Sequence, residues 1–194
     1  MVHVMLDLET WGVMPGSALR SIGAVLFDPR GGCVCSLEPR EFYANIDRAS
    51  CELAGLAVDP ATVRWWERQP QEAQDALLAD AKPLRVAAME FHEWWRLARA
   101  RYLWSNGANF DEPLWRAACS AVGLRVPWAY WDVRDTRTAW DLAGVDARAV
   151  RRSGVVHNAL DDARHQAHCV ALAYRRLGLA RGSEPAPPVA MELI

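Results

Sequence analysis

The sequence predicts an α/β protein in which a central mixed β-sheet is flanked by helices. Short apolar runs open the chain, amphipathic helical segments follow, and a further apolar run separates two of these segments. A length of 194 residues suits one domain, and 52% hydrophobic with 24% charged residues is typical of a globular protein. We therefore expect one domain over residues 1–180 and a Pro/Ala-rich tail over residues 181–194.

The opening of the chain predicts strands. Val2–Leu6 is an apolar run that ends in Asp7, as expected of a buried strand that delivers a carboxylate at its end. Further strands are predicted at Ser21–Phe27, Cys33–Leu37 and Phe42–Ile46. The turn sequence DPRGG joins the first two of these, so the strands should form an antiparallel meander.

Helical segments occupy most of the remaining chain. Asp59 followed by Pro60 is an N-cap with proline at the first helical position, which predicts a helix over the next residues. Further helices are expected at Pro83–Arg101, Asp111–Val122, Thr136–Leu142 and Asn158–Leu177. Two short strands are expected between them, at Tyr102–Trp104 and Trp128–Val133.

The composition limits where the protein works. No apolar stretch approaches the ~20 residues of a membrane helix, and the first residues lack the basic head and apolar run of a signal peptide. The five cysteines are odd in number and form no C-x-x-C pair, which argues against a disulfide framework and a zinc ribbon. We expect a cytoplasmic protein with reduced thiols and no membrane partner.

The net charge of −2 argues against a long cationic groove for nucleic acid. All but one of the 22 Lys and Arg residues are arginine, and ten residues are tryptophan. Arginine pairs well with phosphate and aromatic rings stack on bases, but a genome rich in G and C and a Trp-rich core would give the same composition. Both explanations stay open on composition alone.

Acidic residues gather at three places, each at the end of an expected strand or the start of an expected helix. Asp7 and Glu9 come directly after the opening strand, and residues two apart in extended chain point to the same side. Asp111 begins one helix, and the pair Asp161 and Asp162 begins the last. Clustered carboxylates repel one another unless a cation lies between them, and oxygen ligands select Mg²⁺ or Mn²⁺. Two such ions can hold the attacking and leaving oxygens of a phosphoryl displacement.

His157 lies five positions before Asp162. On one continuous helix the two side chains would point about 140° apart, because there are 3.6 residues per turn. They can act together only if His157 lies in the preceding loop, with Asn158 as the helix cap. An imidazole in that place suits the role of general base.

These segments resemble a known family. Asp7–Thr10, Asn106–Asp111 and His157–Ala163 are similar to the three exonuclease motifs of the DEDD superfamily, and the histidine marks its DEDDh branch. Asp59–Gln69 resembles a helix of the exodeoxyribonuclease VIII-like and mycobacterial 3′–5′ exoribonuclease-like group. The resemblance spans Val2–Leu177.

The resemblance implies an RNase H-like exonuclease fold and removal of nucleotides from the 3′ ends of single-stranded RNA or DNA. It also implies two ions of Mg²⁺ or Mn²⁺ in one active site. Asp7, Glu9 and Asp162 would hold one ion, and Asp7 with Asp111 the second. His157 would be the general base.

The resemblance further implies substrate contacts. Leu8 and Phe110 would pack on the base or sugar, and Thr10 would act through its backbone. Asn106, from the second motif, is counted with them. Trp65 and Trp66 point about 100° apart on one helix, so they cannot both face inward. Trp66 is favoured as the ring beside the terminal base, and a purely structural pair is the alternative. RNA or DNA preference stays open, as does a homodimer, which many relatives form.

Two other functions remain in view. One is a catalytically idle module of the same fold that captures nucleic-acid ends. The other is a phosphodiesterase that acts on free nucleotides. A lack of metal binding and of turnover would favour the idle module over the exonuclease. Relative rates on a mononucleotide ester and an oligomer would separate the phosphodiesterase from the exonuclease.

Overall fold

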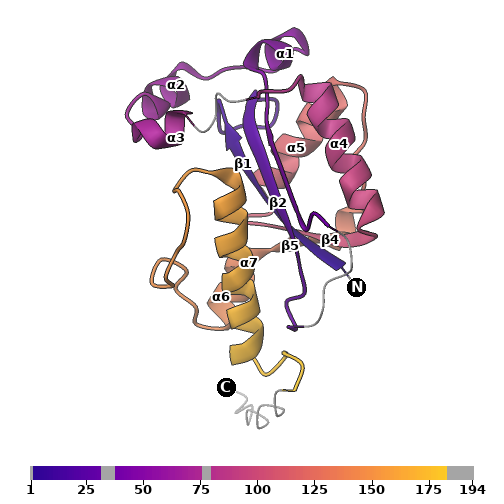
Figure 1. Cartoon of the computed structure of the whole chain (residues 1–194), viewed down its shortest axis with the longest axis vertical. Coiled ribbons are helices and arrows are strands. Elements are labelled where there is room, and N and C mark those ends of the chain that lie inside the picture. The colour runs from indigo at the N-terminus through magenta and orange to yellow at the C-terminus, as the bar shows by residue number, and fades with distance from the viewer. Residues whose placement is uncertain (1, 32–37, 76–79, 183–194) are drawn as a thin grey trace, which may run out of the picture.

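The structure is a computed structural model that describes residues 2–31, 38–75 and 80–182. Its five-stranded mixed sheet has the order β3-β2-β1-β4-β5. Figure 1 shows β1 and β2 side by side in it. The strands are β1 (Val2–Thr10), β2 (Leu19–Phe27), β3 (Glu41–Asn45), β4 (Ala100–Ser105) and β5 (Val133–Asp135). The predicted α/β class and mixed sheet are confirmed.

Strand β1 lies at the centre of the sheet. It pairs antiparallel with β2, with Asp7 opposite Gly23, and parallel with β4, with Met5 opposite Trp104. Strand β5 continues the parallel half beside β4. The carboxyl ends of β1, β4 and β5 therefore meet at one edge of the sheet, where parallel sheets commonly place ligands.

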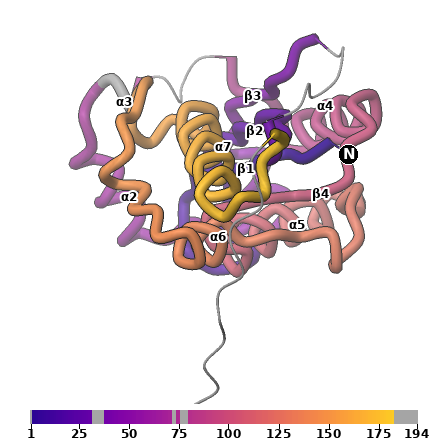
Figure 2. The backbone as a smooth tube through the Cα atoms, turned by 90° about the horizontal axis from the view of Figure 1, so that it is seen from below, coloured from indigo at the N-terminus to yellow at the C-terminus, as the bar shows by residue number. Residues whose placement is uncertain are grey.

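Helices cover both faces of the sheet. Their bounds are α1 (Arg48–Leu53), α2 (Pro60–Trp66), α3 (Gln71–Asp75), α4 (Leu84–Leu97), α5 (Asp111–Ala121), α6 (Thr136–Leu142) and α7 (Ala159–Arg176), with a 3₁₀ turn at Tyr130–Asp132. Helices α4 and α5 pack on one face and α7 on the other, with α6 beside α7 (Figure 2).

A hydrophobic core lies on each face of the sheet, and successive side chains of β1 point alternately into one and the other. Val4, Leu6 and Leu8 are buried against α4 and α5. Met5 is buried on the opposite face, in the core that includes α7. Since successive strand residues point to opposite faces, Asp7 and Glu9 share the α7 face with Met5.

Several predicted bounds differ from the structure. The strand expected at Trp128–Val133 is wrong, because a 3₁₀ turn exposes the rings of Tyr130 and Trp131 and the strand begins at Val133. The helix expected to reach Arg101 ends at Leu97, since Arg99 has a φ of +50°, outside the helical region. The short helices α1 and α3 were not predicted from the sequence.

The other expected elements appear close to their predicted positions, including α7 and the Asp59 cap of α2. The strand expected at Cys33–Leu37 lies outside the described residues, as do residues 183–194 of the expected tail. Within the described part of the chain, no helix has the length and apolar character needed to cross a membrane.

Candidate active site

The end of β1 supplies two buried carboxylates. Asp7 is only 9% exposed, and Glu9 is 7% exposed. Both point to the α7 face of the sheet, as their spacing predicts. Leu8 between them faces the other core.

Asp111 joins this pair through the backbone of β1. It lies in the first turn of α5, is 2% exposed, and its Oδ1 accepts a hydrogen bond from the Leu8 N–H at 3.2 Å. The loop before it turns at Gly107, which has a φ of +96°. That conformation suits glycine and brings the chain from β4 back to the edge of β1.

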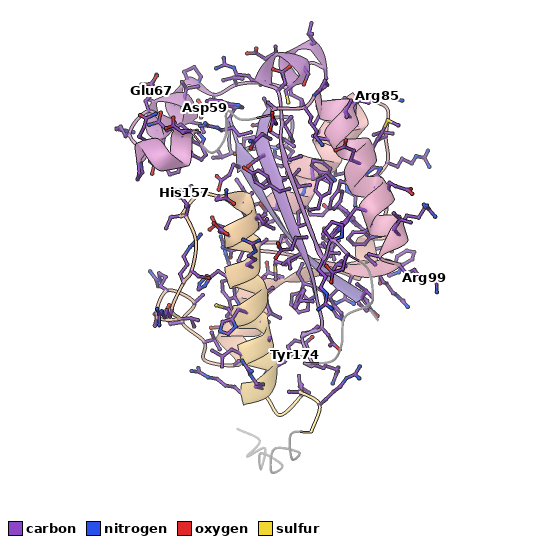
Figure 3. The ribbon with its side chains drawn as sticks, in the orientation of Figure 1. Asp59, Glu67, Arg85, Arg99, His157 and Tyr174 are labelled. Carbon is purple, nitrogen blue, oxygen red and sulfur yellow. The ribbon has the colours of Figure 1, made fainter. Side chains whose placement is uncertain are left out.

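The start of α7 supplies the remaining acidic and basic groups. The Asn158 side chain caps the helix by accepting from the N–H groups of Leu160 and Asp161. His157 precedes this cap with a φ of +64°, so it lies in the loop and not on the helix. Figure 3 shows His157 beyond the end of α7, on the side of α2. The predicted placement of His157 in the loop is confirmed.

Close packing fixes the start of α7 over β1 and β2. A Cβ atom at Gly23 would collide with the backbone of Ala159 and Leu160, so the helix lies directly on this glycine. Gly23 is also the β2 partner of Asp7. The absent side chain therefore allows the helix that carries Asp162 to approach the strand that carries Asp7.

Asp162 completes the cluster. Glu9, His157 and Asp162 each place one potential ligand atom within 4.8 Å of the others. Asp7 and Asp162 line one pocket of about 380 Å³. The hard carboxylate oxygens of this group fit a divalent ion such as Mg²⁺ or Mn²⁺, and the imidazole lies beside them.

Asp161, next in sequence, has a structural role. Its Oδ2 accepts from the Val155 N–H at 2.9 Å, and its Oδ1 accepts from Arg164 at 2.6 Å. The first contact holds the loop that carries His157, and the second lies within α7. The structure thus separates the two adjacent aspartates, as the motif spacing predicts.

Burial and mutual repulsion shift the pKa values of the clustered carboxylates. Burial raises the pKa of Asp7 well above its ordinary value, and the charges of Asp111 and Glu9 raise it further. Burial, with the charge of Asp111, raises the pKa of Glu9 to about 8. Burial raises the pKa of Asp111 to about 7. A divalent cation would stabilise the ionised forms, so the electrostatics fit a metal site.

The pKa of His157 moves in the other direction. Burial lowers it, and the nearby positive charge of Arg152 lowers it further. The imidazole is therefore neutral at pH 7 and can accept a proton. Its ring stands edge-on to Trp65, with 4.9 Å between the ring centroids.

An apolar pocket of about 450 Å³ adjoins the cluster. Leu8, Thr10 and Phe110 all line it, as expected for the predicted substrate contacts. Trp66 forms part of its wall but is only 3% exposed, because its Nε1 donates to the Thr10 carbonyl at 2.9 Å. Trp65, 37% exposed, presents the more open ring, which is opposite to the predicted order.

Asn106 lies away from this apolar pocket. Its Oδ1 accepts from Arg137 Nε at 3.1 Å and from the Thr136 hydroxyl at 3.4 Å. It lines two other pockets, of about 380 and 840 Å³, that share part of their walls. The five predicted substrate contacts are thus divided between two sides of the carboxylate cluster.

Gln166 was missed by the sequence reasoning. It is 5% exposed, and its Nε2 donates to Asp7 Oδ1 at 2.7 Å. Its Oε1 is buried without a hydrogen-bond partner in the described part of the chain. This unpaired acceptor beside Asp7 suits a hydrated cation. The available signal was its position four residues after Asp162, on the same helix face.

Arg20 was missed as well. It is 6% exposed, and its guanidinium carbon lies 4.2 Å from the Trp11 ring centroid and 3.8 Å from that of Trp66. The charge of Arg20 opposes the rise in the pKa of Glu9. The two rings therefore hold a cation close to the first motif.

The chain matches a family model over residues 2–174, described as the 3′-5′ exoribonuclease Rv2179c-like domain. Among proteins with curated functions, no match was found.

Solved structures that match include E. coli exonuclease I in complex with a dT13 oligonucleotide, with 15% identity and a TM-score of 0.60 over 91% of this chain. The chain spans 41% of that protein's length. The nuclease domain of 3′hExo, a DEDDh family member bound to rAMP, has 13% identity and a TM-score of 0.58, with 95% of this chain and 97% of that chain covered. S. pombe Pop2p, in a form with Mg²⁺ and Mn²⁺ bound, has 14% identity and a TM-score of 0.53, with 90% and 83% covered. The fold is that of the RNase H-like exonuclease domains, as predicted.

Proposed function

The chain belongs to the Rv2179c-like 3′-5′ exoribonuclease domain family, and from this membership we propose a metal-dependent 3′–5′ exonuclease that trims single-stranded RNA or DNA. One observation carries the proposal. The carboxylates of residues 7, 9, 111 and 162 converge beside a neutral histidine and next to an apolar pocket. Two-metal sites of this kind serve hydrolysis of phosphate esters, among other reactions, and the family membership favours the phosphodiester.

Asp7, Glu9, Asp111 and Asp162 would hold two ions of Mg²⁺ or Mn²⁺, which supply positive charge for the oxygens of the reacting phosphate. A water oxygen would bond to phosphorus while the bond to the 3′ oxygen of the preceding nucleotide breaks, and that oxygen would take up a proton from solvent. His157 accepts the proton of the water, because its lowered pKa leaves it neutral. The product is a nucleoside 5′-monophosphate.

The apolar pocket would receive the terminal nucleoside. Leu8 and Phe110 provide walls for the base or sugar, and the exposed Trp65 ring stands between the pocket and His157. Aromatic faces stack on any base, so this pocket suits a sequence-tolerant enzyme. Since the family is described as exoribonuclease, RNA is the first substrate to test.

Substitution of the two adjacent aspartates tests the site. Asp162→Asn should lower the Mg²⁺-dependent trimming rate of a 5′-labelled strand by about 10³-fold or more, because it removes a charged ligand. Asp161→Asn is the matched control, since an amide oxygen still accepts from the Val155 N–H. It should stay within about tenfold of the wild type. Full activity in Asp162→Asn would contradict the metal assignment.

The same assay separates the competing functions. Faster hydrolysis of a mononucleotide ester than of an oligomer would favour a phosphodiesterase on free nucleotides. Binding of strand ends without turnover would favour an idle module. Matched RNA and DNA oligonucleotides then measure the sugar preference, which depends on contacts to the 2′-hydroxyl.

A further inference from the structure

His157 is held in place by aromatic rings. It lies in the loop before the Asn158 cap, and its imidazole stands edge-on to Trp65 and Trp66, with 4.9 and 6.0 Å between the ring centroids. Within residues 2–31, 38–75 and 80–182, the imidazole makes no hydrogen bond. A histidine that acts as a base is commonly oriented by a hydrogen bond at its other ring nitrogen. At His157, the rings of α2 take the place of that hydrogen bond.

Trp66 fixes the position of these rings. Its Nε1 donates to the Thr10 carbonyl at 2.9 Å, and the Arg20 guanidinium carbon lies 3.8 Å from its ring centroid. Trp65 packs edge-on against Trp66, with 5.0 Å between the ring centroids. Helix α2 is therefore attached to β1 and β2 through the buried Trp66, and Trp65 contacts both this fixed ring and His157.

Trp65 also lines the apolar pocket of about 450 Å³. That volume lies within the usual range for small-molecule sites. Leu8 and Phe110 contribute to the same pocket, and the Trp65 ring is partly exposed there. A base that fills the pocket would pack on this ring, because aromatic rings stack on bases of any kind. One side chain thus adjoins both the site for the terminal base and the imidazole.

We propose that Trp65 is a positioning residue that makes the action of His157 depend on the terminal base: the base packs against Trp65, and the ring then holds the imidazole where it can take the proton of the attacking water. The proposal rests on the exonuclease function proposed above. Its consequence is kinetic. A base in the pocket should raise the rate of the chemical step and not only the affinity for the strand.

Single-turnover trimming at a saturating strand concentration tests the role of the ring. Trp65→Leu keeps an apolar side chain but removes the ring, so the maximal rate should fall by about tenfold or more. Trp65→Phe keeps a ring beside the imidazole and should stay within about threefold of the wild type. Trp131→Leu is the matched control, because it is the same substitution at an exposed tryptophan of the 3₁₀ turn, outside the pocket, and it should leave the rate unchanged. An unchanged maximal rate in Trp65→Leu would overturn the proposal.

A strand that lacks its 3′-terminal base tests the dependence on the base. In RNA or DNA, whichever is trimmed faster, a reduced abasic residue replaces the terminal nucleoside and keeps the 3′-hydroxyl. At saturation the wild type should remove this residue about tenfold more slowly than a normal nucleotide, whereas Trp65→Leu should remove both at similar rates. If Trp65→Leu keeps the full preference of the wild type for the normal end, the link through Trp65 is wrong.

Removal of the imidazole tests whether Trp65 acts through it. In a His157→Ala protein, the further change Trp65→Leu should lower the residual maximal rate by less than about twofold. General damage to the fold would lower the rate by the same factor with and without the imidazole. Such independent losses would overturn the positioning role.

The outcomes also separate this proposal from the function on which it rests. If the wild type trims the normal strand and Trp65→Leu trims it equally fast, only the role of Trp65 fails. If the wild type releases no nucleotide in Mg²⁺, the exonuclease function is wrong, and both proposals fall together.

Discussion

Asp161 and Asp162 differ by one position but take part in different interactions. Asp161 holds the loop through the Val155 N–H, whereas Asp162 faces Glu9 and His157. On a helix, neighbouring side chains point about 100° apart, so only one can face β1. The resemblance to the DEDDh motifs assigns the metal-ligand role to Asp162, and that role stays a prediction.

Glu9 gives a prediction about pH. Its pKa is about 8 in the folded chain, against 4.5 for an ordinary glutamate. The folded state therefore holds a proton that the unfolded state has lost between about pH 4.5 and 8, and the wild type loses stability as pH rises through that window. Glu9→Gln lacks this loss, so at pH 8 the metal-free variant should be more stable by on the order of 2–4 kcal/mol.

Urea unfolding of both metal-free proteins at pH 5 and pH 8 measures this difference. The gap between variant and wild type should widen with pH. Saturating Mn²⁺ should reverse it, because the variant loses a metal ligand. A gap that is the same at both pH values would contradict the raised pKa.

Other residues of the site could not be predicted from spacing alone. Gln166 contacts Asp7, which lies 159 positions earlier in the chain, only because the fold brings α7 onto β1. The order of Trp65 and Trp66 depends on which ring reaches the Thr10 carbonyl, a tertiary contact. Such tertiary contacts cannot be predicted from the local sequence.

At the scale of elements, strong hydrophobic periodicity and clear helix caps were sufficient to predict where the longer elements lie. The long helix α7 and the Asp59 cap of α2 fall close to their predicted positions. The errors lie in short pieces, such as the 3₁₀ turn at Tyr130–Asp132 and helix α1. A single turn gains little from its own periodicity, so tertiary contacts decide whether it forms.

The contact between α7 and β2 gives a prediction at this scale. Gly23→Ala places a methyl group against the backbone of Ala159 and Leu160, so the first turn of α7 must shift. We expect a stability loss of about 1–3 kcal/mol and a fall in trimming rate of about 10²-fold. Thermal unfolding and the trimming assay measure the two effects.

Ser21→Ala is the matched control for this substitution, because Ser21 lies two residues away in β2 and loses an atom instead of gaining one. Its trimming rate should stay close to the wild type. A fully active Gly23→Ala protein would show that α7 need not lie so close to β1 for activity.

At the scale of the whole molecule, the topology brings the three motifs together. Central β1 is parallel to β4, so the end of β1 and the loop after β4 reach the same edge of the sheet. Helix α7 crosses the opposite face from α4 and α5 and begins at that edge (Figure 1). Residues more than 100 positions apart thus form one site, with Leu8 bonded to Asp111.

We propose that this edge of the sheet is a metal-dependent 3′–5′ exonuclease site. The most direct measurement follows a single-stranded oligonucleotide labelled at its 5′ end, with Mg²⁺ and with a chelator, and identifies the released product. We predict stepwise shortening from the 3′ end that yields nucleoside 5′-monophosphates and stops when the metal is removed. Release from the 5′ end, 3′-phosphate products, or an undiminished rate in the chelator would contradict the account.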